Sequence, residues 1–341
     1  MRIRWISFLF GLAAVILLAG CGSKSKEDVL EDLDKKVEEM KGYKLNATMT
    51  LTMGTEEQKY DIDIWHNKPD HYRVHMKNAE RDQSQMILKN KDGVYVLTPA
   101  LNKSYKFQSS WPKNSSQPYL YESLVQDLLE DEDVKMKETD KHYIFEAKTR
   151  YQYNKMLPLQ EVKINKKNLA PVSVKVMDQD RNVKLKVDFA KAEFDAKFDE
   201  GSFDLKRNMT SAQMEVPVSS AVESSGRDFT VKIPATEIAG AALVDEQEIL
   251  TSNGKRVILT YDGDKSYTIM QEQVEVLETT SLAPAVINGD PVDLGFTIGA
   301  LTDHSLTWTD GNVEYLIASN DLTKEEMVML AQSFQNVSAE K

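Results

Sequence analysis

The segment YKLNATMTLTM, residues 43–53, alternates apolar and polar side chains along its whole length. Successive side chains of a β-strand point to opposite faces, so this pattern predicts a strand with one apolar and one polar face. Similar alternation returns at residues 60–64, 72–76 and 183–189, with turn residues between these stretches. Helices and strands do not alternate along this part of the chain, which favours a single antiparallel sheet.

Helical spacing marks the segment before this first strand. Val29, Leu33, Val37 and Met40 repeat along one stripe of residues 25–41, and Ser25 is suited to cap the helix. A second, short helix is predicted near residues 120–128, whereas residues 101–116 read as polar and irregular. We expect about eight to ten strands before residue 190, a number at which sheets tend to curl.

The chain of 341 residues divides into two domains around a serine-rich segment at residues 211–226, which we interpret as a linker. Residues 27–210 form the sheet domain and residues 227–341 a smaller α+β domain. Asp-Gly turns at 262–263 and 310–311 predict hairpins in the second domain. Thr323 and Glu326 form a capping box at the start of its last helix.

The first 20 residues are typical of a signal peptide. Arg2 and Arg4 precede an uncharged apolar stretch that is short for a membrane span and ends in Leu-Ala-Gly-Cys at positions 18–21. This ending resembles the lipobox of bacterial lipoproteins. The resemblance implies cleavage between Gly20 and Cys21, with covalent diacylglycerol and an N-acyl lipid on Cys21 and residues 21–26 as a lipidated tether. The alternative is an ordinary secretory signal with an incidental cysteine.

Charge and composition exclude several classes of protein. The chain carries 42 basic and 54 acidic residues, a net charge of −12, which disfavours a nucleic-acid partner. A single cysteine excludes an intramolecular disulfide or a cysteine-based zinc cluster. Glycine-rich phosphate loops and nucleophile elbows are missing from the sequence, so we expect neither an enzyme nor a bound cofactor.

Three histidines, His66, His71 and His75, are close together in the sequence. On a strand, His71 and His75 share the polar face with Arg73 and Lys77, and two neighbouring cations disfavour a metal ion there. We therefore favour a solvent-facing strand surface over a metal site.

Residues 26–208 resemble the LolA-like family of periplasmic lipoprotein carriers. The resemblance rests on the first helix, the long alternating meander, a final strand pair at 169–176 and 183–189, and the acidic, phenylalanine-containing segment at 198–204. It implies an unclosed antiparallel β-barrel with covering helices and an apolar cavity that receives acyl chains. Residues 225–338 resemble a domain of unknown function in Bacillus-type extracytoplasmic and sporulation proteins, which implies a role in sporulation.

The apolar strand face has two interpretations. It forms either a packed core against the first helix or a cavity for an acyl chain, in which methionine supplies adaptable surface. With the family resemblance we favour the cavity. Its predicted lining residues are Met49, Leu51, Met53, Ile62, Ile64, Tyr72, Val74 and Met76.

Two functional hypotheses follow. In the first, the protein is an extracytoplasmic lipoprotein, anchored to the cell membrane, that binds lipid or lipoprotein acyl chains without catalysis. In the second, it is an interaction or sensory lipoprotein whose C-terminal domain docks an envelope protein. An exposed apolar patch around Trp308 and the last helix would favour the second hypothesis.

Replacement of Cys21 tests the predicted anchor. Cys21→Ala should move the protein from the membrane fraction to the soluble fraction, because two acyl chains anchor a protein stably and none remains. Fractionation of cells followed by immunoblotting measures this. Ser23→Ala serves as the control, and a Cys21→Ala protein that stays with the membranes would contradict lipid anchoring.

Overall fold

The computed structural model describes residues 24–53, 56–78, 80, 83–107, 111, 115–151, 156–214, 229–238, 240–251, 254–274, 284–287 and 289–335. The predicted signal peptide and half of the tether, residues 21–23 with Cys21, lie outside these residues. Of the predicted linker, residues 215–226 also lie outside, whereas residues 211–214 belong to a helix, α4 (Leu205–Met214).

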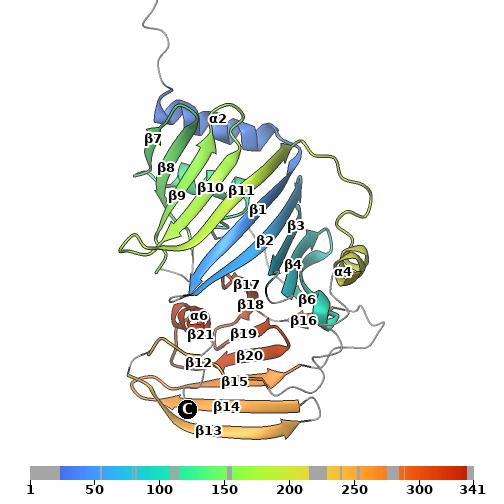
Figure 1. Ribbon diagram of the computed structural model, residues 1–341, viewed down its shortest axis with the longest axis vertical. Helices are drawn as coiled ribbons and strands as arrows, with labels where there is room; N and C mark the ends of the chain where they lie inside the picture. The colour runs from blue at the N-terminus through green and yellow to red at the C-terminus, as the bar shows by residue number, and fades with distance from the viewer. Residues whose placement is uncertain are drawn as a thin grey trace, which may run out of the picture.

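An open sheet of twelve strands dominates the first part of the chain (Figure 1). Its strands are β1 (Gly42–Met53), β2 (Glu56–Asn67), β3 (His71–Asn78), β4 (Gln83–Asn90), β5 (Gly93–Thr98), β6 (Lys103–Phe107), β7 (Lys135–Glu138), β8 (His142–Lys148), β9 (Leu159–Asn165), β10 (Pro171–Met177), β11 (Val183–Phe194) and β16 (Ala285–Ile287). The order is β16-β6-β5-β4-β3-β2-β1-β11-β10-β9-β8-β7, so β7 and β16 are the two edges. The predicted open α+β fold with an antiparallel sheet is confirmed, apart from the parallel pair β16–β6.

The strand predicted from residues 43–53 lies in the middle of this sheet. β1 pairs with β2 on one side and with β11 on the other, both antiparallel. A row of inward side chains crosses the neighbouring strands in direct register: Leu45, Ile64, Val74, Ile87 and Val96. All five are at most 2% exposed, so the alternation along each strand becomes one continuous apolar inner face.

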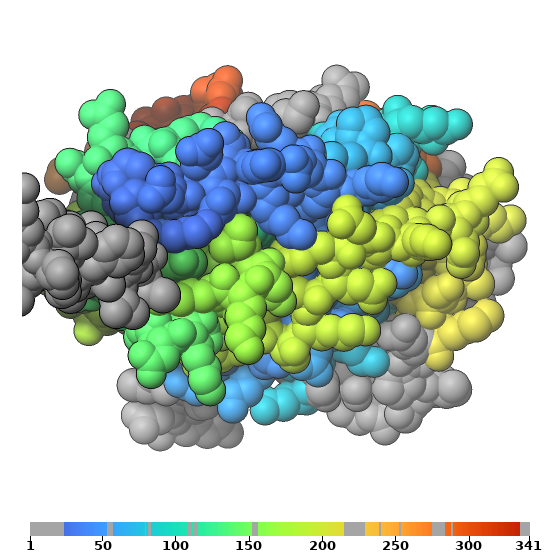
Figure 2. All heavy atoms as spheres, turned by 90° about the horizontal axis from the view of Figure 1, so that it is seen from above, coloured from blue at the N-terminus to red at the C-terminus, as the bar shows by residue number. Residues whose placement is uncertain are grey.

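Two helices bury this inner face. α2 (Lys26–Glu39) lies across one end of the sheet, and Figure 2 looks onto that end. The predicted cap is confirmed, because the Ser25 hydroxyl accepts a hydrogen bond from the Asp28 N–H at 3.1 Å. Val29 and Leu33 of α2 pack in the same apolar cluster as Leu124 and Leu128 of α3 (Tyr121–Glu130).

A third helix covers part of the outer face. Met209 and Ala212 of α4, together with Phe203, pack against Met86 and Leu88 of β4. Strands β4 and β5 are therefore buried on both faces. The sequence pattern did not predict α4, and it did not predict β6 within the supposedly irregular residues 101–116.

A second sheet of seven strands forms the C-terminal unit, in the order β13-β14-β15-β20-β19-β18-β17. Its strands are β13 (Ala242–Thr251), β14 (Gly254–Asp262), β15 (Tyr267–Gln273), β17 (Asp290–Asp293), β18 (Ile298–Leu301), β19 (Ser305–Asp310) and β20 (Val313–Ala318). Helix α6 (Lys324–Gln332) packs on it, and β12 (Ile233–Pro234) pairs with β21 (Phe334–Gln335). Both predicted hairpins and the Thr323–Glu326 capping box are confirmed.

The C-terminal unit closes the end of the first sheet opposite α2 (Figure 1). Ile298 and Ala300 of β18 belong to the apolar cluster of the first sheet. The Gln85 Oε1 atom accepts a hydrogen bond from the Ile298 N–H at 2.9 Å. β16 extends from the C-terminal part of the chain to pair with β6. The two units thus share a core as well as a sheet edge.

Gly295 tests this shared core. Its backbone has φ +88°, and a Cβ there would lie 3.0 Å from the Leu51 Cδ1 atom. We expect Gly295→Ala to lower the free energy of unfolding by about 2 kcal/mol, from left-handed strain plus displacement of Leu51. Urea denaturation measures this.

The matched control is Gly240→Ala, because Gly240 has φ +62° with no atom within 4 Å of its Cβ position. The control carries the backbone strain alone, about 1 kcal/mol. Equal losses in the two variants would contradict a tight contact between the units.

Candidate binding face of the open sheet

Seven of the eight predicted lining residues come together on the inner face of β1, β2 and β3. Their exposed fractions lie between 0% and 9%, and all seven share one cluster with α2 and α3. They are Met49, Leu51, Ile62, Ile64, Tyr72, Val74 and Met76. Met53 ends β1 opposite Glu56, and its side chain lies outside the described part of the chain. The predicted acyl cavity among these residues stays a prediction.

A polar cluster lies at the α2 end of this face. The Tyr43 hydroxyl donates a hydrogen bond to Glu122 Oε2 at 2.5 Å, which connects β1 to the first turn of α3. The His66 ring stacks on Tyr72 with 4.3 Å between centroids. Burial raises the pKa of the Tyr43 hydroxyl and lowers that of His66, so both side chains are neutral at pH 7.

The sequence analysis grouped His66 with His71 and His75 and did not predict that it is buried, although its position carried a signal. It has the same parity along the strand as Ile62 and Ile64, and it lies opposite Tyr43. Alternation therefore directs it inward, and its exposed fraction is 2%.

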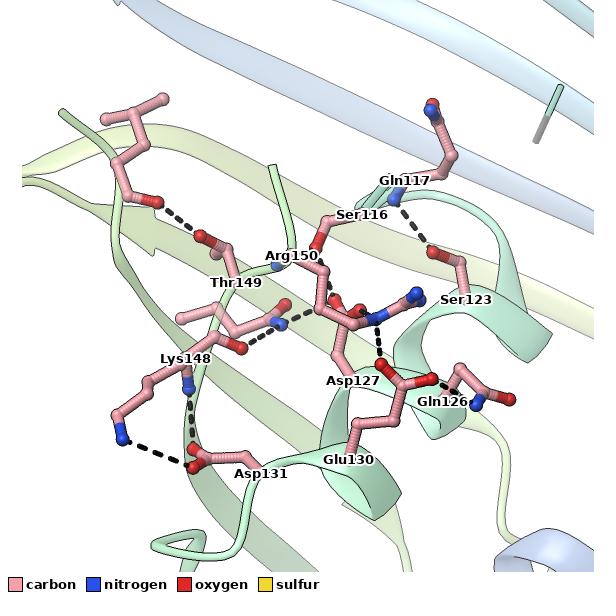
Figure 3. Close-up of polar contacts among 12 residues, drawn as sticks. Ser116, Gln117, Ser123, Gln126, Asp127, Glu130, Asp131, Lys148, Thr149 and Arg150 are labelled. Carbon is pink, nitrogen blue, oxygen red and sulfur yellow. Dashed lines mark hydrogen bonds and ion pairs between the residues drawn. The ribbon is translucent and has the colours of Figure 1, made fainter. Parts of the chain in front are cut away.

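A buried carboxylate attaches α3 to the sheet (Figure 3). Asp127 is 1% exposed and accepts hydrogen bonds from Ser116 Oγ at 2.8 Å, Gln160 Nε2 at 2.6 Å and Arg150 Nε at 2.6 Å. Burial raises the pKa of this carboxyl, while the three donors oppose that rise. Removal of one member of a buried ion pair lowers the free energy of unfolding by about 3–5 kcal/mol. The pair between Asp127 and Arg150 therefore holds α3 in its position on the sheet.

The sequence analysis predicted a helix near residues 120–128 but missed this carboxylate on it. The available signal was an aspartate at helical spacing between Leu124 and Leu128, on the stripe that the helix buries. Its partners come from three segments: Ser116 precedes α3, Arg150 follows β8 and Gln160 is in β9. The sequence pattern does not show that these segments meet.

A groove of about 420 Å³ lies on the opposite, polar face of β1, β2 and β3. Its lining residues include Asp61, Asp63, Arg73, His75 and Lys77. Arg73 donates hydrogen bonds to Asp63 Oδ2 at 2.6 Å and to Asn208 Oδ1 of α4 at 2.8 Å.

The prediction of a solvent-facing surface here was wrong for two residues, since Arg73 is 8% and His75 is 7% exposed. Arg73 is buried because α4 packs against this face, and the sequence analysis did not predict α4. Within the described ranges, no group of three or more His, Cys, Asp or Glu side chains could hold a metal ion.

The region around Trp308 belongs to the buried core of the C-terminal unit. An exposed apolar patch there would have favoured a docking site. Trp308 is 3% exposed, stacks on Tyr315 at 5.1 Å and contacts the edge of Phe334. Met327 and Leu330 of α6 are fully buried beside it. The docking hypothesis therefore finds no support at this site.

Among the helices that the structure describes, none is both long and apolar enough to cross a membrane.

Comparison with known proteins identifies the family. A family model described as sporulation protein YdcC-like matches residues 1–203. The sporulation protein YdcC of Bacillus subtilis (strain 168) is 49% identical over 338 residues, covering 99% of this chain and 98% of the relative. The chain belongs to the YdcC-like family of sporulation proteins. The predicted resemblance to Bacillus-type sporulation proteins is thus confirmed.

Solved structures similar to this YdcC-like chain are distant. The MucA/MucB complex of Pseudomonas aeruginosa matches with 12% identity and a TM-score of 0.33, covering 90% of this chain and 98% of the other. The LolA superfamily protein NE2245 of Nitrosomonas europaea matches with 10% identity and a TM-score of 0.30, covering 53% and 98%. At such low scores these structures carry no argument about the fold or function of this chain.

The lowered pKa of His66 predicts an acid-sensitive fold. The unfolded chain takes up a proton near the ordinary pKa of 6.5, whereas the folded protein does so only at lower pH. The free energy of unfolding should therefore fall as the pH drops below about 6.5. His66→Phe keeps a ring against Tyr72 and should reduce this fall.

Urea denaturation of both proteins at a series of pH values measures the difference. His304→Phe is the control, because His304 is exposed. Parallel stability curves for the wild type and His66→Phe would contradict a neutral, buried His66.

Proposed function

We propose that this YdcC-like protein is a lipoprotein of the cell envelope, anchored to the outer side of the cytoplasmic membrane, that binds an acyl chain of a lipid or lipoprotein without catalysis. The site is the space between the inner face of β1, β2 and β3 and the helices α2 and α3. The observation that carries the proposal is the continuous apolar inner face of an open sheet, covered by two short helices.

The chemistry of this face suits an acyl chain. Most inward side chains from the middle of the strands are aliphatic or methionine, including Met49, Ile64 and Met76, and Tyr60 lies opposite Met49. Each buried methylene of a ligand contributes about 0.8 kcal/mol, and methionine side chains adapt to irregular shapes. An acyl chain that enters between the sheet and a helix replaces the apolar contacts between these two elements with its own apolar contacts to each of them.

Helix α3 is the element that would move. It has ten residues and is held to the sheet by the Asp127 cluster at one end and by Glu122 at the other. Both attachments are polar, and each consists of side-chain hydrogen bonds. Displacement of α3 therefore exposes an apolar surface without breaking any strand pairing.

The predicted anchor is close to this site along the sequence. Lys26, the first residue of α2, follows Cys21 by five residues, and five extended residues span at most about 18 Å. A lipidated Cys21 would therefore hold the α2 end of the sheet near the membrane and direct the C-terminal unit away from it (Figure 1). Membership of the YdcC-like family supports a role in sporulation.

Photo-crosslinking tests acyl binding in the complete chain. Cells are supplied with a diazirine-labelled fatty acid that enters their phospholipids, and mass spectrometry maps the crosslinks. We expect labels on inner-face residues of β1 to β3. Met49→Trp fills the space of about two methylenes and should reduce labelling about tenfold.

The matched control is Lys59→Trp, which places the same side chain on an exposed position of β2. Circular dichroism confirms that both variants fold. Equal labelling of the two variants, or labels confined to the exposed surface, would contradict an acyl site inside the sheet.

A further inference from the structure

The edge strand β13 is exposed along nearly its entire length. Nine of its ten residues are exposed, and it pairs with β14 alone among the described residues. Figure 1 shows it at the end of the molecule opposite α2. One row of backbone N–H and C=O groups therefore has no strand beside it, and such an edge is a template for another strand.

The side chains of β13 form a pattern of apolar ends and an acidic centre. Asp245, Glu246 and Glu248 occupy the centre, and residues 242–251 contain no lysine, arginine or proline. Exposed apolar residues flank the acids: Leu243, Val244, Ile249 and Leu250, with exposed fractions of 40%, 60%, 40% and 83%. Edge strands usually exclude partners with lysine or proline, which this strand lacks.

The carboxylates lie on both faces of the strand. Glu246 is opposite Leu259, a core residue of β14, whereas Asp245 is opposite Thr260 on the other face. Glu248 already has an ion pair with Lys255 at 2.6 Å. Asp245 and Glu246 thus present negative charge on both faces at the centre of the open edge.

We propose that β13 binds an extended, basic segment of a partner protein, which adds to the C-terminal sheet as a further strand. Backbone hydrogen bonds would supply affinity, as in other cases of strand addition. Consecutive lysine or arginine residues would contact Asp245 and Glu246 on the two faces. Apolar residues on either side of the basic run would cover the ends of β13.

Charge argues against a second copy of this chain as the occupant. Full antiparallel pairing of two β13 strands places Asp245 opposite Glu248, twice across the two-fold axis, and Glu246 opposite Gln247. Like charges directly opposite each other destabilise a strand pair. The same carboxylates would be repelled by anionic lipid headgroups, so a membrane surface is also disfavoured.

Peptide binding to the complete chain in a neutral detergent tests the proposal, with fluorescence anisotropy as the readout. The probe is a labelled peptide as long as β13, with three central lysines between valine–threonine repeats. We expect binding that weakens as salt is added. A peptide with proline at alternate positions should not bind, because proline cannot donate to a ladder.

The double variant Asp245→Asn/Glu246→Gln should weaken binding about tenfold, because it removes two ion pairs while leaving the strand intact. Glu31→Gln/Asp34→Asn removes two exposed charges from α2 and should leave binding unchanged. The proposal is overturned if the neutralised β13 binds as well as the wild type, or if the proline peptide binds equally. A wild-type dimer in sedimentation that Ile249→Pro dissociates would also overturn it, since a second copy would then occupy the edge.

Discussion

An open sheet with one apolar face cannot be stable in water unless something else covers that face. In this protein the inner row through Leu45, Ile64 and Val74 runs across neighbouring strands in direct register, so the apolar surface is continuous. Three elements bury it: α2 at one end, α3 across the face, and β18 of the C-terminal unit at the other end. The position of every helix on this side follows from that requirement.

The covering elements are attached by different kinds of interaction, which has consequences for motion. α2 packs through fully buried Val29 and Leu33, and β18 packs through Ile298 with close contact at Gly295. α3 combines an apolar stripe with hydrogen bonds from Tyr43 and around Asp127. A hydrogen bond depends steeply on the distance and angle between donor and acceptor, so it is lost as soon as they separate. Apolar contacts weaken more gradually with separation. This difference is the reason why α3 is the movable cover in the proposed acyl site.

The edges of the two sheets are treated differently. At one edge of the first sheet, β6 is paired with β16, a strand from the C-terminal part of the chain. The other edge, β7, is four residues long and carries lysine and glutamate. In the second sheet, β13 is long, exposed and acidic. Short or covered edges prevent unwanted pairing, so a long open edge points to an interaction with another molecule.

The sequence by itself determined the local elements of this protein. Alternation from Tyr43 to Met53 predicted the central strand and its buried face, and the boxes at Ser25 and Thr323 predicted where two helices begin. These signals depend on residues that are close in the chain, where side-chain direction and backbone hydrogen bonding follow from spacing alone.

Only the tertiary structure decided which polar residues are buried and how the two units meet. Arg73 is covered because Asn208 of α4 reaches it across 135 positions of sequence, and Asp127 finds Arg150 and Gln160 on separate segments. β16 joins β6 from a different part of the chain, and Gly295 meets Leu51. Such contacts depend on how elements pack in space, and hydrophobic burial is non-directional, so the pattern along the chain does not specify them.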